Sequence, residues 1–369
     1  MAIGEFSYWR LVWSNIRVRP VRTGLSMIAV AIQVLLILLI VGMINGVVSG
    51  WGQRVEGVGA DLMVQPPNST IFFAFSTASL PESLGQKIQQ VPGVKTVSPV
   101  LVMVERRSFG VVYGIDLKSF EDMSNGFRFL AGGPFRGPSD VIVDSIQAQT
   151  HHLQVGERIT ILNHAFTVCG IVPSGKGARE YVPLATAQAM RGAAGKVSMF
   201  YVHSTGDTES TLRSLVQALP HDRILSVKEY LTLMNTSSLP DLQPFIQSMV
   251  GLGVAISFLV VFLATYTIVL ERTHEIGILK ALGASRSQLM GLILEETVIM
   301  AGFGILLGLG STWLTWSVLH HSLPSLSILI PAHWVANAIA LGFAAAIAGA
   351  CYPAFRAARF DPADALAHE

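Results

Sequence analysis

Charged side chains are scarce in this sequence of 369 residues. Asp, Glu, Lys and Arg together make up 13% of it, whereas 51% of the residues are hydrophobic. Soluble domains carry about 25% charged residues, and the mean hydropathy here is +0.52. The formal net charge is +1, so the chain lacks the basic field of a nucleic-acid-binding protein. This composition predicts a membrane protein that does not bind nucleic acid.

Cysteine and catalytic motifs are also sparse. The two cysteines, Cys169 and Cys351, fall in a polar region and in a hydrophobic run, so we expect no disulfide between them. The histidines lack the spacing of zinc ligands, and no G-x-S-x-G motif occurs. The phosphate-binding pattern G-x-x-x-x-G-K-[ST] is absent as well. We therefore expect a non-catalytic subunit without cofactor or metal, which depends on another chain for any ATP hydrolysis.

The sequence contains several long runs without charged residues. A membrane-spanning helix needs about 20 apolar residues, and four segments qualify: Gly24–Ile44, a part of Gln247–Leu270, and two parts of Thr297–Phe355. The polar, proline-containing stretch His320–Pro331 divides the last region. The first apolar stretch is longer than the core of a cleaved signal peptide, so we interpret it as a membrane anchor.

Basic residues set the orientation of these spans. They gather before the first span, between the second and third, and after the fourth: Arg10, Arg17, Arg19 and Arg22; Arg272, Lys280 and Arg286; Arg356 and Arg359. The positive-inside rule then places both termini in the cytoplasm. The predicted fold class is a membrane protein with four transmembrane α-helices and a large α+β extracytoplasmic domain inserted between the first and second helices.

The predicted boundaries follow from the same pattern. We expect four membrane spans, at 23–46, 246–270, 297–319 and 332–354. Outside the cytoplasm we expect the large domain at 47–245 and an outer loop at 320–331. On the cytoplasmic side we expect an amphipathic elbow helix at 1–22, a connector with the start of the third span at 271–296, and a C-terminal segment at 355–369. In the last segment, Asp361, Pro362 and Asp364 form a typical helix start.

The outer segment alternates helix-like and strand-like stretches, and residues 140–173 suggest a small antiparallel β subdomain. Asp140 and Asp144 share a strand face, and we interpret them as solvated carboxylates because no acid–base partner is evident. The apolar stretch Ile71–Leu80 is either core or a mobile hydrophobic loop.

Small and polar residues mark the spans. Gly304 and Gly308 form a G-x-x-x-G pattern that allows close helix contact, either within one bundle or with a second chain. Gln33 and Asn337 are isolated polar residues, for which interhelical hydrogen bonds are the simplest explanation. No charged residue falls deep in a predicted span, which argues against an ion channel or proton-coupled carrier.

The connector ERTHEIGILKALGASRSQL, residues 271–289, predicts a separate short helix. Ile276, Leu279 and Leu282 form a narrow apolar stripe, and Gly283 suits a left-handed helix end. Ser285 and Gln288 form a capping box that starts the next helix. A simple connector needs fewer residues, so a docking surface is the alternative interpretation.

Two motifs carry a resemblance to a known family. ERTHEIGILKALGASRSQLMGLILEE and YPAFRAARFDPADALAHE resemble the connector and the C-terminal segment of FtsX/MacB-type permeases of ABC transporters. The resemblance implies that the connector is a coupling helix, which docks on the ATPase subunit. This role would fall on Glu275, Ile276, Gly277, Lys280, Ala281, Leu282, Gly283 and Ala284.

The resemblance also implies partners and a location. The partners would be a cytoplasmic ABC ATPase subunit, a second permease chain in a homo- or heterodimer and the lipid membrane, with a periplasmic adaptor as a further candidate. The location would be the bacterial inner membrane. The expected function is export or extrusion of a peptide, lipid, lipoprotein or hydrophobic drug. The alternative is a non-transporting mechanotransmitter that activates an extracytoplasmic partner such as a cell-wall hydrolase.

Overall fold

The computed structural model describes residues 20–67, 69, 79–105, 110–124, 126–233, 242–322 and 325–359. The predicted elbow helix before residue 20, the stretch 71–78 and the C-terminal cap at 361–364 lie outside these residues. The chain divides into two compact units. The first, here called the membrane unit, comprises Met1–Gly46, Pro240–Ser322 and Ile328–Glu369. The second, here called the outer domain, comprises Val47–Leu239 and Leu323–Ser327.

Long apolar helices build the membrane unit. Its elements are α2 (Pro20–Glu56), α9 (Leu242–Glu271), the short α10 (Thr273–Ala281), α11 (Arg286–Ser322) and α12 (Ala332–Arg359). Among the described residues, four helices are long and apolar enough to cross a membrane, namely α2, α9, α11 and α12. The 28 residues of α12 span about 42 Å, more than the roughly 30 Å of hydrocarbon in a bilayer. The predicted four-helix membrane fold is therefore confirmed.

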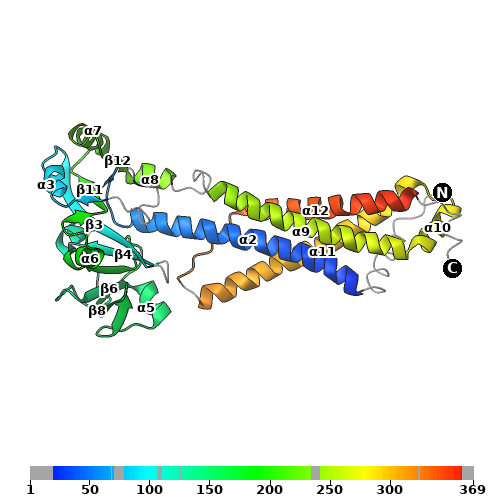
Figure 1. Ribbon diagram of the computed structural model, residues 1–369, viewed down its shortest axis with the longest axis horizontal. Coiled ribbons are helices and arrows are strands. Elements are labelled where there is room, and N and C mark those ends of the chain that lie inside the picture. The colour runs from blue at the N-terminus through cyan, green and yellow to red at the C-terminus, as the bar shows by residue number, and fades with distance from the viewer. Residues whose placement is uncertain are drawn as a thin grey trace. The chain divides into compact units, whose positions relative to one another are not determined.

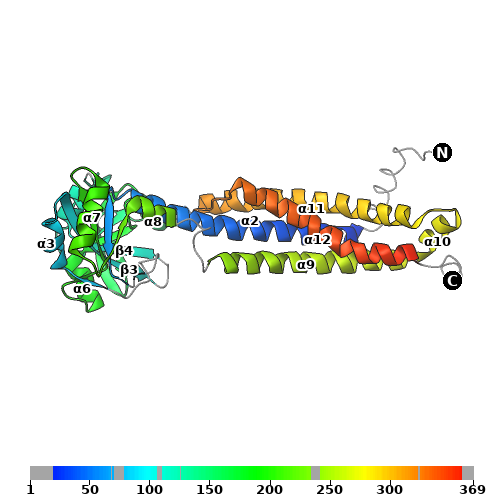
Figure 2. The same ribbon diagram turned by 90° about the horizontal axis from the view of Figure 1, so that it is seen from above.

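Glycines allow the helices of this unit to approach closely. A Cβ added at Gly304 of α11 would lie 2.7 Å from the carbonyl oxygen of Met27, and one at Gly308 would lie 2.8 Å from Cβ of Val34. The G-x-x-x-G pair thus packs against α2 of the same chain. A Cβ added at Gly349 of α12 would lie 2.9 Å from the carbonyl oxygen of Phe258 on α9. Both views in Figures 1 and 2 show these helices running side by side.

Among the described residues, the structure shows no interhelical hydrogen bond for either of the two isolated polar residues of the spans. Gln33 is buried, and neither its side-chain oxygen nor its side-chain nitrogen has a partner among the described residues. Its neighbour on α9 is Gly253, which has no side chain to offer. Asn337 lies on an exposed part of α12. The prediction was wrong because pairing depends on which faces meet, and residue type does not reveal this.

One continuous ten-stranded sheet organises the outer domain. Its strands, in spatial order, are β12 (Arg223–Ser226), β1 (Leu62–Gln65), β11 (Met199–Ser204), β3 (Val94–Glu105), β4 (Gly110–Ile115), β9 (Glu180–Pro183), β6 (Asp140–Asp144), β8 (His164–Val172) and β5 (Ala131–Gly132), with β7 (Arg158–Ile161) also paired to β8. A separate two-stranded sheet joins β2 (Leu80–Pro81) and β10 (Lys196–Val197). The predicted α+β class is confirmed.

The separate antiparallel subdomain expected at residues 140–173 was wrong. Strand β6 pairs with β8 in parallel and with β9 antiparallel, so these strands continue the main sheet. The segment that leads from β6 to β8 contains helix α5 (Ser145–His151) and strand β7. A helical crossover of this kind returns the chain in the same direction, and the alternating sequence pattern cannot reveal that.

Helices cover both faces of the sheet. Residues of α3 (Leu84–Gln89), α5, α6 (Leu184–Arg191) and α7 (Thr208–Ala218) join one hydrophobic cluster. Residues of α4 (Leu117–Met123), α8 (Val227–Leu233) and the last turns of α2 join the other. Trp51 of α2 donates a hydrogen bond to the hydroxyl of Tyr230 on α8 at 3.2 Å. Trp51 and Val55 near the end of α2 therefore belong to the core of the outer domain.

Candidate functional site

Backbone hydrogen bonds make α10 a separate helix with a defined end. Gly283 has φ of 97°, a left-handed conformation that glycine adopts without a Cβ clash. The amide of Ala284 donates to the carbonyl of Leu279 at 3.0 Å, and the amide of Gly283 donates to the carbonyl of Lys280 at 3.0 Å. These two bonds form a Schellman motif. The predicted stop at Gly283 is confirmed.

The next helix restarts at once. The backbone amide of Ser285 donates to Oε1 of Gln288 at 2.9 Å, and the amide of Gln288 donates to Oγ of Ser285 at 3.3 Å. This reciprocal pair is the predicted capping box, and it satisfies two amides that the start of a helix leaves without backbone partners. Two opposed caps thus separate α10 from α11.

The inner face of α10 contacts three other helices. Ile276 is 7% exposed and packs in a cluster with Val269 of α9, Leu289 of α11 and Ala357 of α12. Gly277 beside it is buried as well. Because side chains in such a cluster interdigitate closely, a displacement of α10 must move or repack all three neighbours.

An ion pair fixes the N-terminal end of α10. Nη1 of Arg272, the residue before α10, lies 3.2 Å from Oε2 of Glu296 on α11, and the two side chains are only 15% and 10% exposed. The sequence analysis used Arg272 only as a basic residue that sets the orientation, and it did not predict the pairing with Glu296. A signal was present, because Arg272 follows one uncharged run and Glu296 directly precedes the next. Since α11 begins at Arg286, Glu296 lies about 15 Å along that helix.

The predicted apolar stripe does not face one environment. Ile276 is buried, Leu279 is 39% exposed and Leu282 is 80% exposed. A spacing of three residues advances about 300° around a helix. Two such steps therefore place Leu282 about 120° away from Ile276. The stripe divides into an inner contact at Ile276 and an outer apolar surface.

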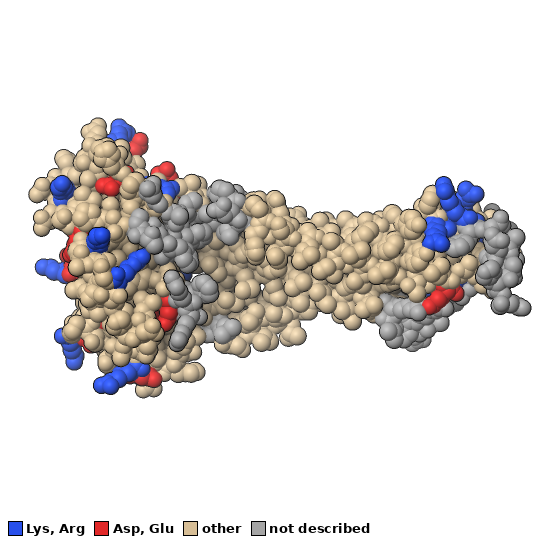
Figure 3. All heavy atoms as spheres, viewed as in Figure 1, with Lys and Arg blue, Asp and Glu red and all other residues tan. Residues whose placement is uncertain are grey.

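The residues assigned to coupling by resemblance fall into three groups. Ile276 and Gly277 are buried, Lys280 and Ala284 are half-buried, and Ala281, Leu282 and Gly283 are exposed. The side chain of Glu275 lies outside what the structure describes. We define the exposed surface of Ile278, Leu279, Ala281 and Leu282 as the ledge. It offers apolar side chains at the end of the membrane unit where, on the face shown in Figure 3, Lys, Arg, Asp and Glu gather.

Another cation at this end connects α9 and α12. A guanidinium nitrogen of Arg356 donates to the hydroxyl of Tyr266, and the guanidinium carbon lies 5.2 Å from the centre of the tyrosine ring. Such cation–π contacts stabilise by about 0.5–1 kcal/mol at exposed sites. The ends of α9, α11 and α12 are thus held together around α10 by one ion pair, one cation–π contact and one apolar cluster.

The outer domain contains a second group of buried charges. Asp144 is 1% exposed, and its Oδ1 accepts a hydrogen bond from the amide of Gln147 at 2.7 Å. Its Oδ2 has no partner within the described chain. The interpretation of Asp144 as a solvated carboxylate was therefore wrong, since it caps α5 from the interior. Asp140 instead accepts bonds from the amides of Arg136 and Gly137 at 2.6 and 2.9 Å.

Burial shifts the acid–base properties of this group. It raises the pKa of Glu180 to about 7, and the nearby charge of Glu105 adds to this effect. Burial also raises the pKa of Asp144 and lowers the pKa of Arg179. Oε1 of Glu180 accepts a hydrogen bond from Nε2 of the Gln147 side chain at 2.7 Å. Glu180 therefore changes protonation near neutral pH.

Arg179 binds a segment that is distant in sequence. Its Nη2 donates to the carbonyl of Ser325 at 2.6 Å. The segment Leu323–Ser327, which links α11 to α12, groups with the outer domain. The amide of Gly177, two residues before Arg179, donates to the carbonyl of Arg54 at 2.7 Å. The stretch preceding β9 therefore contacts both the end of α2 and the α11–α12 link.

Two protein-family models match this chain. Residues 23–219 match the MacB-like periplasmic core domain, and residues 248–362 match the C-terminal part of FtsX-like permeases. The chain belongs to this family of ABC transporter permeases. The family expected from the two sequence motifs is confirmed, and the protein is a multi-pass membrane protein.

The chain is similar to two curated export proteins and to one solved domain structure. The macrolide export ATP-binding/permease protein MacB of Neisseria meningitidis is 37% identical over 101 residues, which cover 27% of this chain and 16% of MacB. The pyoverdine export ATP-binding/permease protein PvdT of Pseudomonas savastanoi is 26% identical over 98% of this chain and 58% of PvdT. The matches thus cover less than two thirds of either relative. The crystal structure of the periplasmic region of MacB from Actinobacillus actinomycetemcomitans aligns with a TM-score of 0.37 and 14% identity, covering 48% of this chain and 93% of that region.

Proposed function

We propose that this permease couples ATP hydrolysis by a separate cytoplasmic ABC ATPase chain to movement of the outer domain. The observation that carries the proposal is the ledge on α10. Leu282 is 80% exposed, while Ile276 on the same short helix packs against α9, α11 and α12. A partner that covers Leu282 would therefore act on three membrane helices through one short element.

The residues proposed to couple are those given by the resemblance. Ala281, Leu282 and Gly283 would contact the ATPase, since they are exposed. Ile276, Gly277 and Ala284 would transmit the movement, since the first two are buried and Ala284 packs against the same cluster. Glu275 and Lys280 would add charge complementarity, which favours the correct partner and orientation.

The proposed location is the bacterial inner membrane with both termini in the cytoplasm. The described membrane unit carries its Lys and Arg residues at the α10 end, and the positive-inside rule assigns that end to the cytoplasm. The proposed partners include a second permease chain, in a homo- or heterodimer, and a periplasmic adaptor. Small residues on the outward face of α12 suit contact with another helix in the membrane: Ala336, Ala340, Ala344 and Ala348.

Export or extrusion of a substrate is the proposed outcome of this movement. Both curated relatives are named for export, of a macrolide in one case and of pyoverdine in the other. The substrate classes considered are a peptide, a lipid, a lipoprotein or a hydrophobic drug. The alternative is a mechanotransmitter without cargo, which uses the outer domain to activate a partner such as a cell-wall hydrolase. The apolar stretches of these helices, residues 23–46, 246–270, 297–319 and 332–354, contain no Asp, Glu, Lys or Arg, which fits helices that transmit movement in either case.

Two substitutions test the coupling proposal. Gly283→Val introduces a branched side chain at a left-handed position, and Glu275→Arg reverses a charge on α10. We expect both to reduce copurification of the ATPase and its stimulated hydrolysis in lipid. Gly291→Val on α11 is the matched control, because nothing lies within 4 Å of an added Cβ there and no positive φ is involved. Unchanged association and hydrolysis in both test variants would remove the coupling role.

A further inference from the structure

An open groove crosses one face of the outer-domain sheet. Its floor includes Val97 and Pro99 of β3 and Phe200 of β11. Pro99 and Phe200 are direct partners across the two strands. Although β3 lies between two other strands, Val97 and Pro99 are only half-buried. The helices of this face thus leave a strip of a central strand open to solvent.

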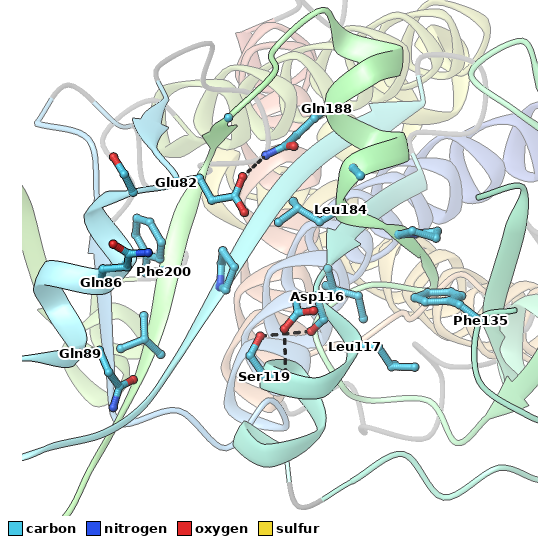
Figure 4. Close-up of a pocket in the computed structure, with 18 of the residues that line it drawn as sticks. Glu82, Gln86, Gln89, Asp116, Leu117, Ser119, Phe135, Leu184, Gln188 and Phe200 are labelled. Atoms are coloured by element: carbon cyan, nitrogen blue, oxygen red, sulfur yellow. Dashed lines mark hydrogen bonds between the residues drawn. The ribbon is translucent and has the colours of Figure 1, made fainter. Parts of the chain in front are cut away.

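Two walls of different chemistry border this floor. Figure 4 shows Glu82, Gln86 and Gln89 on one side, and Leu117 and Phe135 on the other. Amide side chains both donate and accept hydrogen bonds, as a peptide backbone does. The second wall also carries Asp116 and Ser119, so an apolar floor lies between a row of polar side chains and a mixed wall. This arrangement suits a chain that presents alternating apolar and polar groups.

The charge of the groove has one sign. Glu82 and Asp116 line it, and among the described lining residues there is no Lys or Arg. Oε2 of Glu82 accepts a hydrogen bond from Gln188, and Oδ2 of Asp116 accepts one from the amide of Ser119 (Figure 4). Within the described part of the chain, neither carboxylate has a basic partner.

Nearby lysines do not change this balance. Lys87, Lys118 and Lys196 are close to lining residues in the sequence, yet none of them lines the groove. Phosphate-bearing ligands are bound through Lys and Arg, so the groove does not suit them. A ligand with a positive charge would complement the two carboxylates.

The groove is larger than a typical small-molecule pocket. Its volume is about 1210 Å³, and pockets for drug-sized ligands measure about 300–1,000 Å³. We infer that this groove binds an extended polypeptide segment with basic side chains. The backbone of the segment forms hydrogen bonds with the glutamines, and its Lys or Arg side chains pair with Glu82 and Asp116. The inference rests on the proposed function, because either export or activation requires the outer domain to engage another molecule.

Binding to the intact chain in phosphatidylcholine nanodiscs tests the inference without any ATPase. The probe is a fluorescein-labelled octapeptide of two Lys, two Leu and four Ser residues, and binding is followed by fluorescence anisotropy against empty nanodiscs. The test variant is Glu82→Gln/Asp116→Asn. Both changes remove charge while keeping the acceptor for Gln188 and a good helix N-cap. The matched control is Asp207→Asn/Glu229→Gln, which removes an N-cap charge from α7 and another charge outside the groove.

We expect the test variant to bind the peptide about five- to tenfold more weakly, with the control variant unchanged. An octapeptide with Glu in place of Lys should bind much more weakly than the basic one. Undetectable binding of the basic peptide, equal binding by the test variant, or equal binding of the acidic peptide would overturn the inference. So would displacement of the peptide by dodecylamine at equal concentration, because a small cationic amphiphile would then suffice. Loss of ATPase association in the ledge variants, with peptide binding intact, would separate this inference from the coupling proposal.

Discussion

The two units of this protein bury charge in different ways. At the α10 end of the membrane unit, Arg272 and Glu296 form a close pair with both side chains largely buried. In the outer domain, Asp144 and Glu180 are buried, and each retains one oxygen without a partner in the described structure. The first arrangement holds helices in one geometry. The second leaves a group that titrates near neutral pH.

Breaking the pair in the membrane unit should have the largest effect. Arg272→Ala leaves Glu296 buried without this partner, and such a loss costs about 3–5 kcal/mol. We expect a marked fall in the thermal unfolding temperature of the detergent-purified chain. The double variant Arg272→Met/Glu296→Leu should recover most of this stability, because it removes both charges and keeps apolar volume. If the single and double variants are equally unstable, the pair does not hold these helices together.

Removing the titrating group in the outer domain should have a smaller, pH-dependent effect. The pKa of Glu180 rises to about 7 in the folded state, so its contribution to stability is fully present below its unfolded pKa of about 4.3. This contribution is lost as the pH rises toward and through 7. Between pH 5 and pH 8 the loss is on the order of 2–3 kcal/mol. Glu180→Gln keeps an acceptor for Gln147 and should not titrate.

The measurement is the unfolding temperature of wild type and variant between pH 5 and pH 8. We expect the Glu180→Gln variant to exceed wild type at pH 8 and to come closest to it at pH 5. Glu157→Gln is the control, because Glu157 is an exposed residue in the same domain and its substitution should leave the pH profile unchanged. A constant difference between wild type and Glu180→Gln across this range would show that ionisation of Glu180 is not involved.

The smallest effect concerns the uncharged polar residue of the membrane unit. Gln33 is buried without a hydrogen-bond partner among the described residues, and such burial costs about 1–3 kcal/mol. Gln33→Leu should therefore raise stability, by about 1 kcal/mol after allowing for imperfect packing. A rise in unfolding temperature supports this, whereas a fall would mean that the amide makes a stabilising contact in the membrane.

Local sequence chemistry predicted the end of α10 and the start of α11 well. A left-handed glycine and a capping box act through backbone groups a few residues away, and the structure contains both at Gly283 and Ser285. The same reasoning failed for the buried carboxyl of Asp144, the unpaired amide of Gln33 and the division of the apolar stripe. Each of these depends on which element packs against the residue, and that information is distributed along the whole chain.

The central claim is that the ledge on α10 is where an ATPase docks. Leu282→Asp tests it most directly, because Leu282 is 80% exposed and contributes little to internal packing. Leu130→Asp is the matched control, since Leu130 is an exposed leucine of the outer domain.

The quantity to measure is the affinity of the purified chain in nanodiscs for the ATPase that copurifies with it. Burying a leucine contributes about 1.5–3 kcal/mol, so we expect Leu282→Asp to weaken binding by about tenfold or more, with Leu130→Asp unchanged. Equal affinity of Leu282→Asp and wild type would contradict the account.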